Sequence, residues 1–317
     1  MNNMLIVAVD TGNKFIKTPH TEPFNAGLVE HGKTEPPISV DTIVYEGNYF
    51  SLTENRIPVM YDKTTNDAYF ILTLFAAARE LIAMLGKRDS YNYDICLAVG
   101  LPPAHLHDLK GKYVDYFKRG GKVSFKYNSS CFELNVVRVE VYAQGFAAIV
   151  PHLATIKTKA RSFIVDIGGY TTDVIKLNAD GIPDLDFCES YNYGVIRLFD
   201  QVQRAVRNKW HQDLDDYMVE AILQGKIDPG ELIRNTVNDT VRQYAKNLIH
   251  TLQEKGVDLS IAYPIFLGGG SLLMKESIAA ELHRDDYLVI EDVRANAIGY
   301  ALLTRAKLGN TPSSNKV

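Results

Sequence analysis

The chain has 317 residues, 46% of them hydrophobic and 23% charged, with a formal net charge of −4 and a pI of about 6.1. This length allows two domains, each with its own hydrophobic core. An acidic chain without a basic block is not expected to bind DNA directly through a charged face. The cysteines, Cys96, Cys131 and Cys188, lie far apart, which is typical of reduced thiols and not of a disulfide framework or metal site.

The sequence gives no indication of membrane attachment. No basic segment precedes the first apolar stretch, so we expect no signal peptide. Residues 68–85 form the most apolar helix candidate, but Arg79 and Glu80 interrupt it, which predicts a packed helix and not a membrane span. We therefore expect a cytoplasmic protein.

The first informative stretch is residues 4–18, MLIVAVDTGNKFIKT. An apolar run ends on Asp10, and a second short apolar run carries Lys17, so the pattern predicts strand, turn and strand. The turn between them consists of Thr11, Gly12 and Asn13. A glycine turn lets backbone N–H groups approach an anion, and a carboxylate at the strand end could hold a hydrated metal.

Residues 27–34, GLVEHGKT, match the P-loop pattern G-x-x-x-x-G-K-T. A functional P-loop follows a buried strand and opens a helix, because the phosphates bind at the helix N-terminus. Pro36 and Pro37 follow directly and oppose a helix. We therefore reject a P-loop and interpret Gly32 and Lys33 as a hairpin turn.

The next elements are predicted from hydrophobic periodicity. Alternation within residues 38–50 indicates strands, and Gly86 closes the first long helix. We then predict a helix at 67–86, a strand at 94–99, an exposed basic helix or loop at 110–121, paired strands at 123–127 and 131–139, and a helix at 140–150.

Residues 162–176, SFIVDIGGYTTDVIK, repeat the first pattern. An apolar run ends on Asp166, and a second one begins beyond the turn. The turn consists of Gly168, Gly169, Tyr170 and Thr171. Taken alone, the stretch could be an ordinary β-hairpin with a surface aspartate. Its repetition in one chain favours two related halves, each with a hairpin suited to phosphate and magnesium.

A third glycine-rich stretch is residues 264–274, PIFLGGGSLLM. A predicted strand enters Gly268, Gly269 and Gly270, and Ser271 is expected to cap a helix. Around this stretch we predict helices at 194–209 (opened by Gly194), 213–223, 231–255, 271–283 and 294–308, a strand at 287–290, and a disordered tail at 309–317.

Together these motifs resemble those of the actin-like ATPase superfamily. Asp10-x-Gly with Lys17 resembles its first phosphate motif, residues 166–173 its second, and residues 267–271 its adenosine motif. Residues 140–149 and 295–303 resemble its connecting helices. Within the superfamily the chain is most similar to the ParM/StbA plasmid-segregation actins.

The resemblance implies an α/β chain with an actin-like fold, in which two related RNase H-like domains flank a nucleotide cleft. Domain I would comprise residues 1–159 and 293–317, and domain II residues 160–292. ATP or ADP with Mg²⁺ would be the cofactors. The nucleotide-binding residues implied are Thr11, Gly12, Asn13, Lys17, Gly168, Gly169, Tyr170, Thr171, Gly194, Gly268, Gly269, Gly270 and Ser271.

The resemblance also assigns catalytic roles. Asp10 and Asp166 would hold Mg²⁺ through water, and Glu140 would act with Asp166 in catalysis by orienting the attacking water. The alternative for Glu140 is an acid that only stabilises a helix N-terminus. Lys17 would add a point charge at the phosphates, although it could also be a lysine at a strand edge.

The implied function is that of a filament-forming ATPase that segregates plasmid DNA, with ATP hydrolysis controlling disassembly. Its partners would be further copies of itself and a DNA-bound adaptor protein. The alternative is a sugar, acetate or pantothenate kinase of the same superfamily, which would need an additional catalytic aspartate, and no clear motif of that kind is present. A chaperone-like ATPase is disfavoured, because no substrate-binding domain follows residue 308.

Overall fold

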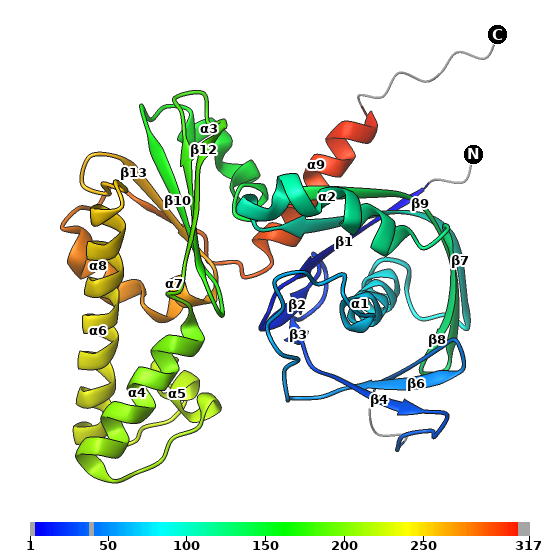
Figure 1. Cartoon of the computed structure of the whole chain (residues 1–317), viewed down its shortest axis with the longest axis horizontal. Helices are drawn as coiled ribbons and strands as arrows, with labels where there is room; N and C mark the ends of the chain where they lie inside the picture. Colours follow the sequence, from blue (N-terminus) through cyan, green and yellow to red (C-terminus); the bar gives the residue numbers. More distant parts are fainter. Residues whose placement is uncertain (1–3, 38–40, 310–317) are drawn as a thin grey trace. The chain divides into compact units, whose positions relative to one another are not determined.

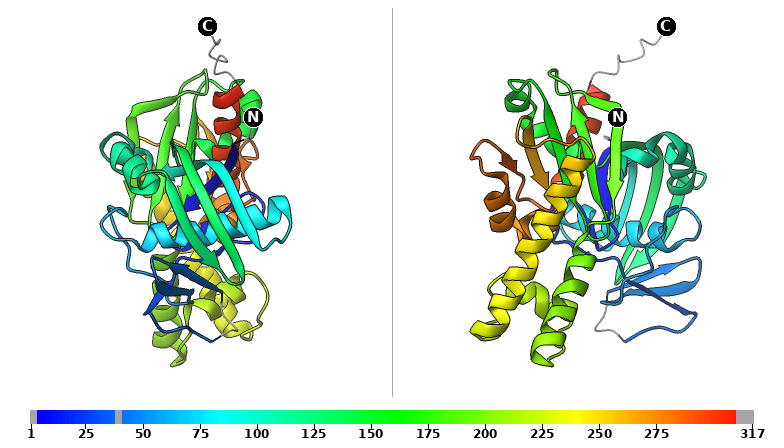
Figure 2. Two further views of the ribbon diagram at one scale, coloured as in Figure 1. Left: turned by 90° about the vertical axis from the view of Figure 1, so that its right-hand side faces the viewer. Right: turned by 60° about the vertical axis from the view of Figure 1, so that its left-hand side comes forward.

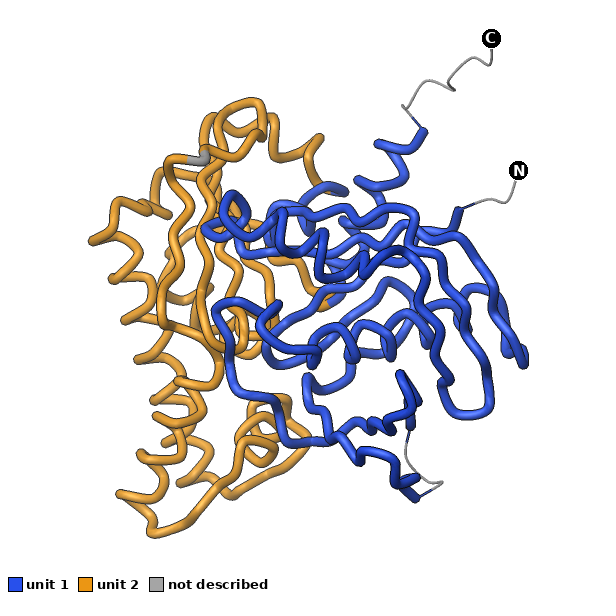
Figure 3. The backbone as a smooth tube through the Cα atoms, turned by 45° about the vertical axis from the view of Figure 1, so that its right-hand side comes forward, with its two compact units in different colours: residues 1–151, 294–317 blue, residues 152–293 orange. Residues whose placement is uncertain are grey.

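The computed structural model describes residues 4–37 and 41–309 and divides the chain into two compact units (Figure 3). Unit 1 comprises residues 1–151 and 294–317, and unit 2 comprises residues 152–293. The first division thus precedes the boundary proposed at residue 159. The strand indication at residues 38–40 and the tail at 310–317 lie outside the described residues.

Within the described residues, unit 1 is built on a nine-stranded sheet of order β3-β2-β1-β7-β9-β8-β5-β6-β4 (Figure 1). Its strands are β1 Leu5–Thr11, β2 Phe15–Lys17, β3 Phe24–Asn25, β4 Leu28–Gly32, β5 Thr42–Tyr45, β6 Asn48–Leu52, β7 Ser90–Leu101, β8 Lys122–Tyr127 and β9 Ser130–Ala143. Its helices are α1 Ala68–Leu85, α2 Pro103–Lys118, α9 Ala295–Gly309 and the 3-10 helix η1 Ala147–His152.

The two faces of β1 pack against different helices, because successive side chains of a strand point to opposite sides. Val7 and Val9 join the core cluster that contains α1. Ala8 packs with Ala98 and with Tyr300 of α9. Among the described helices, α1 alone is long and apolar enough to cross a membrane, but 67% of it is buried in the fold, as for the packed helix that was predicted.

Glycine allows α9 to lie close to the rest of unit 1. A Cβ at Gly299 would lie 1.9 Å from the carbonyl oxygen of Ala147, and one at Gly100 would lie 1.9 Å from the Tyr300 hydroxyl. Real atoms cannot approach so closely, so these positions accept no larger side chain without movement of the helix. The position of α9 therefore depends on both glycines.

We expect Gly299→Ala to destabilise unit 1 by about 1–3 kcal/mol or more, because the new methyl group would force α9 away from Ala147. The matched control is Gly111→Ala in α2, where an added Cβ meets nothing within 4 Å. This control should stabilise the protein by roughly 0.5–1 kcal/mol. Urea titrations followed by circular dichroism measure both changes, and equal midpoints for the two variants would contradict the packing argument.

The structure corrects several predictions for unit 1. The helix predicted at 140–150 is wrong, because β9 continues to Ala143 and only Ala147–His152 is helical. Long-range pairing with β7 decides this conformation, since residues 138–143 form a continuous parallel ladder with it. Residues 110–118 of the basic segment predicted at 110–121 belong to α2, which buries one apolar face. The rejection of the P-loop is confirmed: residues 28–32 form strand β4, Lys33 lies in a turn, and no helix follows within residues 33–37.

Unit 2 is built on a five-stranded sheet of order β12-β11-β10-β13-β14. Its strands are β10 Ser162–Ile167, β11 Thr172–Leu177, β12 Pro183–Tyr191, β13 Tyr263–Leu267 and β14 Leu288–Val289. Its helices are α3 Leu153–Ile156, α4 Val195–Trp210, α5 Asp216–Leu223, α6 Glu231–Glu254, α7 Gly269–Leu273 and α8 Lys275–Leu282. Helices α4 and α6 run side by side and share the core (Figure 2). The single helix predicted at 271–283 is wrong, because Met274 separates α7 from α8.

Five strands in each unit follow the same plan. In unit 1, β3, β2 and β1 pair antiparallel in turn, and β1, β7 and β9 then pair parallel. In unit 2, β12, β11 and β10 pair antiparallel, and β10, β13 and β14 then pair parallel. The two units are therefore related in topology, as the repeated hairpin motif predicted.

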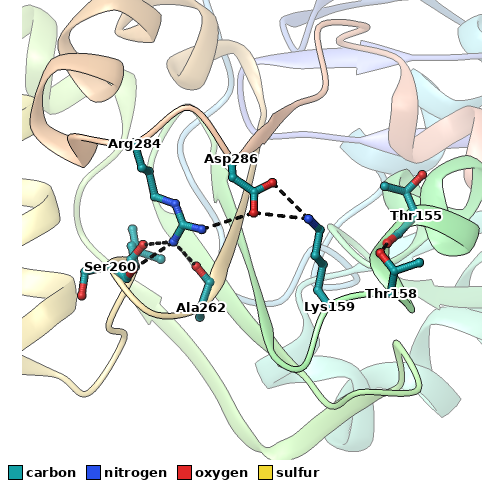
Figure 4. A network of polar contacts seen from close by, with 8 residues as sticks. Thr155, Thr158, Lys159, Ser260, Ala262, Arg284 and Asp286 are labelled. Atoms are coloured by element: carbon teal, nitrogen blue, oxygen red, sulfur yellow. Dashed lines mark hydrogen bonds and ion pairs between the residues drawn. The ribbon is translucent and has the colours of Figure 1, made fainter.

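A polar network ties together the segments that enter the parallel strands of unit 2 (Figure 4). The Arg284 guanidinium donates to the carbonyl oxygens of Leu259, Ser260 and Ala262 at 3.0, 3.1 and 2.7 Å. Asp286 accepts hydrogen bonds from Arg284 and from Lys159. This network lies at the amino ends of the strands, so it anchors the sheet and leaves the carboxyl ends for other contacts.

Candidate functional site: an acidic hairpin in each unit

In unit 1 the β1–β2 hairpin positions a buried carboxylate. Asp10 pairs with Lys17 across the hairpin and is only 2% exposed. The Lys17 ammonium lies 3.2 Å from Asp10 Oδ2, and Gln144 Nε2 donates to Asp10 Oδ1 at 3.0 Å. A cation and an amide thus hold the carboxylate in place, which offsets the cost of burying its charge.

Gln144 reaches Asp10 because β1, β7 and β9 are parallel, and the carboxyl ends of parallel strands meet at one edge of a sheet. It follows β9 directly, and its backbone N–H donates to the carbonyl of Leu101 at 2.8 Å. The next N–H, of Gly145, donates to Asn296 Oδ1 of α9 at 2.8 Å. Gln144 was not predicted from the sequence, because residues 140–150 were expected to be helical; the end of a predicted parallel strand would have indicated it.

Glu140 lies within β9 and not at a helix start. It pairs with Ala98 in the parallel ladder and is 7% exposed. Its carboxylate forms ion pairs with Arg138 and with Lys307 of α9, the latter at 2.6 Å. These contacts give Glu140 a structural role in attaching α9 to the sheet, and its catalytic role stays a prediction.

The turn of the first hairpin requires glycine at residue 12. A Cβ there would lie 2.6 Å from the carbonyl oxygen of Phe15 and 3.8 Å from the Lys17 ammonium. The Lys17 charge therefore lies beside the turn, in addition to contacting Asp10. A backbone turn without a side chain and with an adjacent cation is suited to binding an anion.

In unit 2, Asp166 occupies the position that corresponds to Asp10. It is the penultimate residue of β10 and pairs across the hairpin with Asp173, where unit 1 has Lys17. The turn is closed by a hydrogen bond of 2.9 Å from the Gly168 N–H to the carbonyl of Thr171. The two hairpins thus share their geometry but differ in the charge opposite the aspartate.

The N-terminus of α4 donates hydrogen bonds to the turn of the second hairpin. The N–H groups of Val195 and Ile196 donate to the carbonyls of Gly168 and Gly169 at 3.0 and 2.9 Å. Gly194 permits the contact, because a Cβ there would lie 2.3 Å from the backbone of Tyr170. The helix opens after Gly194, as predicted, and the positive end of its dipole faces the turn. The structure gives Gly194 a packing role, and direct contact with a nucleotide stays a prediction.

The triple glycine lies against the Asp166 hairpin. Leu267 pairs with Asp166, and a Cβ at Gly268 would lie 2.5 Å from Asp166 Oδ1. Gly270 is equally restricted, with a Cβ position 2.4 Å from Ile167 Cγ2. Glycine is therefore required for the third segment to approach the carboxylate.

Ser271 does not cap the helix as predicted. Gly268 occupies the N-cap position of α7, and Ser271 lies inside that helix. Its side chain is 1% exposed, and its hydroxyl donates to the carbonyl of Leu267 at 2.6 Å. The hydroxyl thus has a structural partner within unit 2.

We expect Gly268→Ala to destabilise unit 2 by about 1–3 kcal/mol, since φ at Gly268 is 86° and the added methyl group would meet the Asp166 carboxylate. Gly269→Ala is the matched control, because an added Cβ there meets nothing within 4 Å. Trp210 is the single tryptophan and lies in unit 2, so its fluorescence during urea unfolding reports on this unit. A loss of stability in the Gly269 variant and none in the Gly268 variant would contradict the expectation.

The predicted residues thus form two groups. In unit 1, Asp10 and Lys17 lie together at the turn that contains Gly12, and Gln144 joins them. In unit 2, the turn from Gly168 to Thr171 lies between Asp166, the N-terminus of α4 and the triple glycine, with Tyr170 46% exposed. Among the described residues, no group of three or more His, Cys, Asp or Glu could hold a metal ion by itself.

Comparison with known proteins supports the actin-like fold that was expected from the sequence motifs. Residues 164–280 match the family described as archaeal actin homologue MreB-like, C-terminal. The archaeal actin homologue Ta0583 superposes with a TM-score of 0.76 at 18% identity, over 96% of this chain and 100% of that one. No curated protein matches the sequence.

Two further solved structures, an actin-like protein and a ParM, are also similar. Actin-like protein Alp7A superposes with a TM-score of 0.75 at 16% identity, over 96% of this chain and 97% of that one. The ParM of a 15-stranded filament from Clostridium botulinum gives a TM-score of 0.71 at 17% identity, over 96% and 100%. The chain therefore has the actin-like fold, as its motifs predicted, and its similarity to ParM proteins agrees with the resemblance stated from the sequence, whereas the similarity to an archaeal actin homologue was not anticipated.

Proposed function

We propose that the chain is an ATP-dependent, filament-forming actin-like protein that segregates plasmid DNA through a DNA-bound adaptor. The observation that carries the proposal is the pair of matched hairpins, with Asp10 and Asp166 at equivalent positions of two topologically related units. Glycine turns and Lys17 suit the binding of phosphates. The solved complex of Ta0583 with ADP adds support, since that protein shares the fold at a TM-score of 0.73.

The donors present fit a hydrated Mg²⁺. This ion prefers oxygen ligands, retains several waters and is usually bound through one or two carboxylates together with phosphates. Asp10 and Asp166 provide such carboxylates, the first held by Gln144 and the second lying against Gly268. A bound Mg²⁺ would neutralise charge on the phosphates during transfer to water.

We propose that Gln144, and not Glu140, orients the attacking water. Hydrolysis of a phosphoanhydride depends mostly on positioning, and a glutamine amide can both donate to and accept from a water molecule. Gln144 contacts Asp10 at the strand edge, whereas the Glu140 carboxylate is engaged with Arg138 and Lys307. The geometry of unit 1 thus favours Gln144.

Gln144→Ala should bind ATP but lose most of its turnover, by a factor of about one hundred, because a positioning group is removed. Glu140→Gln keeps the shape of the side chain and should retain turnover. Phosphate release and ATP calorimetry measure the two quantities. Lys33→Ala is a control for binding, since Lys33 belongs to the rejected P-loop. A loss of turnover in Glu140→Gln with normal turnover in Gln144→Ala would return the role to Glu140.

Assembly into filaments is supported by structural neighbours whose solved forms are filaments, Alp12 and the Clostridium botulinum ParM. Head-to-tail contacts between like subunits produce open filaments when the rotation between neighbours does not close into a ring. The acidic chain is not suited to holding DNA by itself, so the proposal includes an adaptor. The second candidate, a small-molecule kinase, would use the same nucleotide site without assembly.

We expect ATP to promote assembly and its hydrolysis to loosen the filaments. Sedimentation and light scattering across a concentration series, with ATP, with ADP and without nucleotide, should show assembly with ATP. Gln144→Ala filaments should persist after wild-type filaments have disassembled. A protein that stays monomeric in all three conditions and phosphorylates a small metabolite would establish the kinase function instead.

A further inference from the structure

A buried lysine contacts the first hairpin from the side of α1. Lys63 lies in the irregular segment between β6 and α1, and it is only 7% exposed. Its ammonium donates to the carbonyl oxygen of Thr11, the last residue of β1. It also lies 4.6 Å from the centre of the Tyr69 ring, which stabilises a desolvated cation. Neither Lys63 nor Tyr69 was singled out by the sequence motifs.

This hydrogen bond fixes the peptide that enters the turn. The Thr11 carbonyl and the Gly12 N–H belong to one peptide unit, which is trans, so the two groups point in opposite directions. A carbonyl directed at Lys63 therefore directs the Gly12 N–H away from it. A charged donor on the carbonyl also polarises the peptide and strengthens its N–H as a donor.

Tyr69 fixes the next residue of the turn. Its hydroxyl donates to Asn13 Oδ1 at 3.2 Å, so the amide NH₂ of Asn13 remains the end that can donate elsewhere. Burial raises the pKa of Tyr69 to about 12, and the hydroxyl therefore stays protonated and remains a donor at neutral pH. Because the Asn13 oxygen is bound to Tyr69, the side-chain NH₂ of Asn13 remains the donor that an anion could accept from.

We propose that Lys63 and Tyr69 are positioning residues that orient the Gly12 N–H and the Asn13 amide toward the phosphates of a bound nucleotide. The inference rests on the proposed nucleotide site, and it assigns the phosphate-dependent part of the affinity to two side chains behind the hairpin. Neither residue is a ligand itself.

The test separates phosphate binding from binding of the nucleoside. Calorimetry gives the affinities of the full chain for Mg–ADP and for adenosine. The affinity for Mg–ADP divided by the affinity for adenosine measures what the phosphates contribute to binding. Tyr69→Phe removes one hydroxyl and keeps the ring, and should lower this ratio about three- to tenfold. Lys63→Met should lower it by about tenfold or more, and Lys63→Arg, which keeps a charged donor, should restore most of it.

Two controls remove comparable groups away from the turn. Tyr91→Phe deletes a buried hydroxyl that donates to the carbonyl of Gly86. Lys112→Met deletes the cation that pairs with Asp62, next to Lys63 in sequence, at 3.4 Å. Both should leave the ratio unchanged, even where they lower the urea midpoint. A purely structural role of Lys63 and Tyr69 would likewise move the midpoint and not the ratio.

The outcomes are distinguishable. An unchanged ratio in Tyr69→Phe and Lys63→Met, with wild-type binding of ADP intact, overturns this inference alone. If the wild-type protein does not bind ADP, the proposed function fails and the inference fails with it. A lower ratio in both variants, with recovery in Lys63→Arg and no change in the controls, supports the positioning role.

Discussion

The buried carboxylate of Asp10 constrains the arrangement of unit 1 at the carboxyl ends of its parallel strands. A charge removed from water costs several kcal/mol unless other groups compensate for it. Lys17 and Gln144 provide that compensation, and each is brought there by a different element of the sheet. The hairpin, the parallel strand β9 and the loop after it must all be in place for the carboxylate to be stable.

In unit 2 the arrangement around the hairpin is constrained by close packing of backbone segments at two glycines. Asp166 lies against Gly268, and Gly194 brings the N-terminus of α4 against the turn after β10. No larger residue fits at either position. Three segments that are distant in sequence therefore meet at this hairpin: the triple glycine lies against the Asp166 carboxylate, and two helical N–H groups donate to the carbonyls of the turn. The turn is held by backbone contacts, which leaves its outer surface available to a ligand.

The two units share one strand topology but differ in the charge that lies opposite the hairpin aspartate. Unit 1 places Lys17 opposite its aspartate, whereas unit 2 places Asp173 there. A lysine neutralises part of the negative charge of a phosphate, while a second acid favours a cation or a polarised water. The shared plan explains how one fold carries two hairpins that differ in the charge opposite the aspartate.

The local features of this protein could be predicted from its amino-acid sequence alone. Both hairpins, the glycines that follow the apolar runs and the long helices were predictable, because turns and periodicity depend on neighbouring residues. The prolines after residue 34 were enough to reject a P-loop.

What required the tertiary structure was the pairing between distant segments. Residues 140–143 form a strand because β7 pairs with them, and this pairing places Gln144 on Asp10 and Glu140 beside Lys307. Lys63 likewise lies in an irregular segment without a motif, and only the tertiary structure brings its ammonium to the Thr11 carbonyl and to the Tyr69 ring of α1. Propensity is a weak local preference, whereas a continuous ladder of hydrogen bonds and a buried charge that needs a partner are decided by the whole fold.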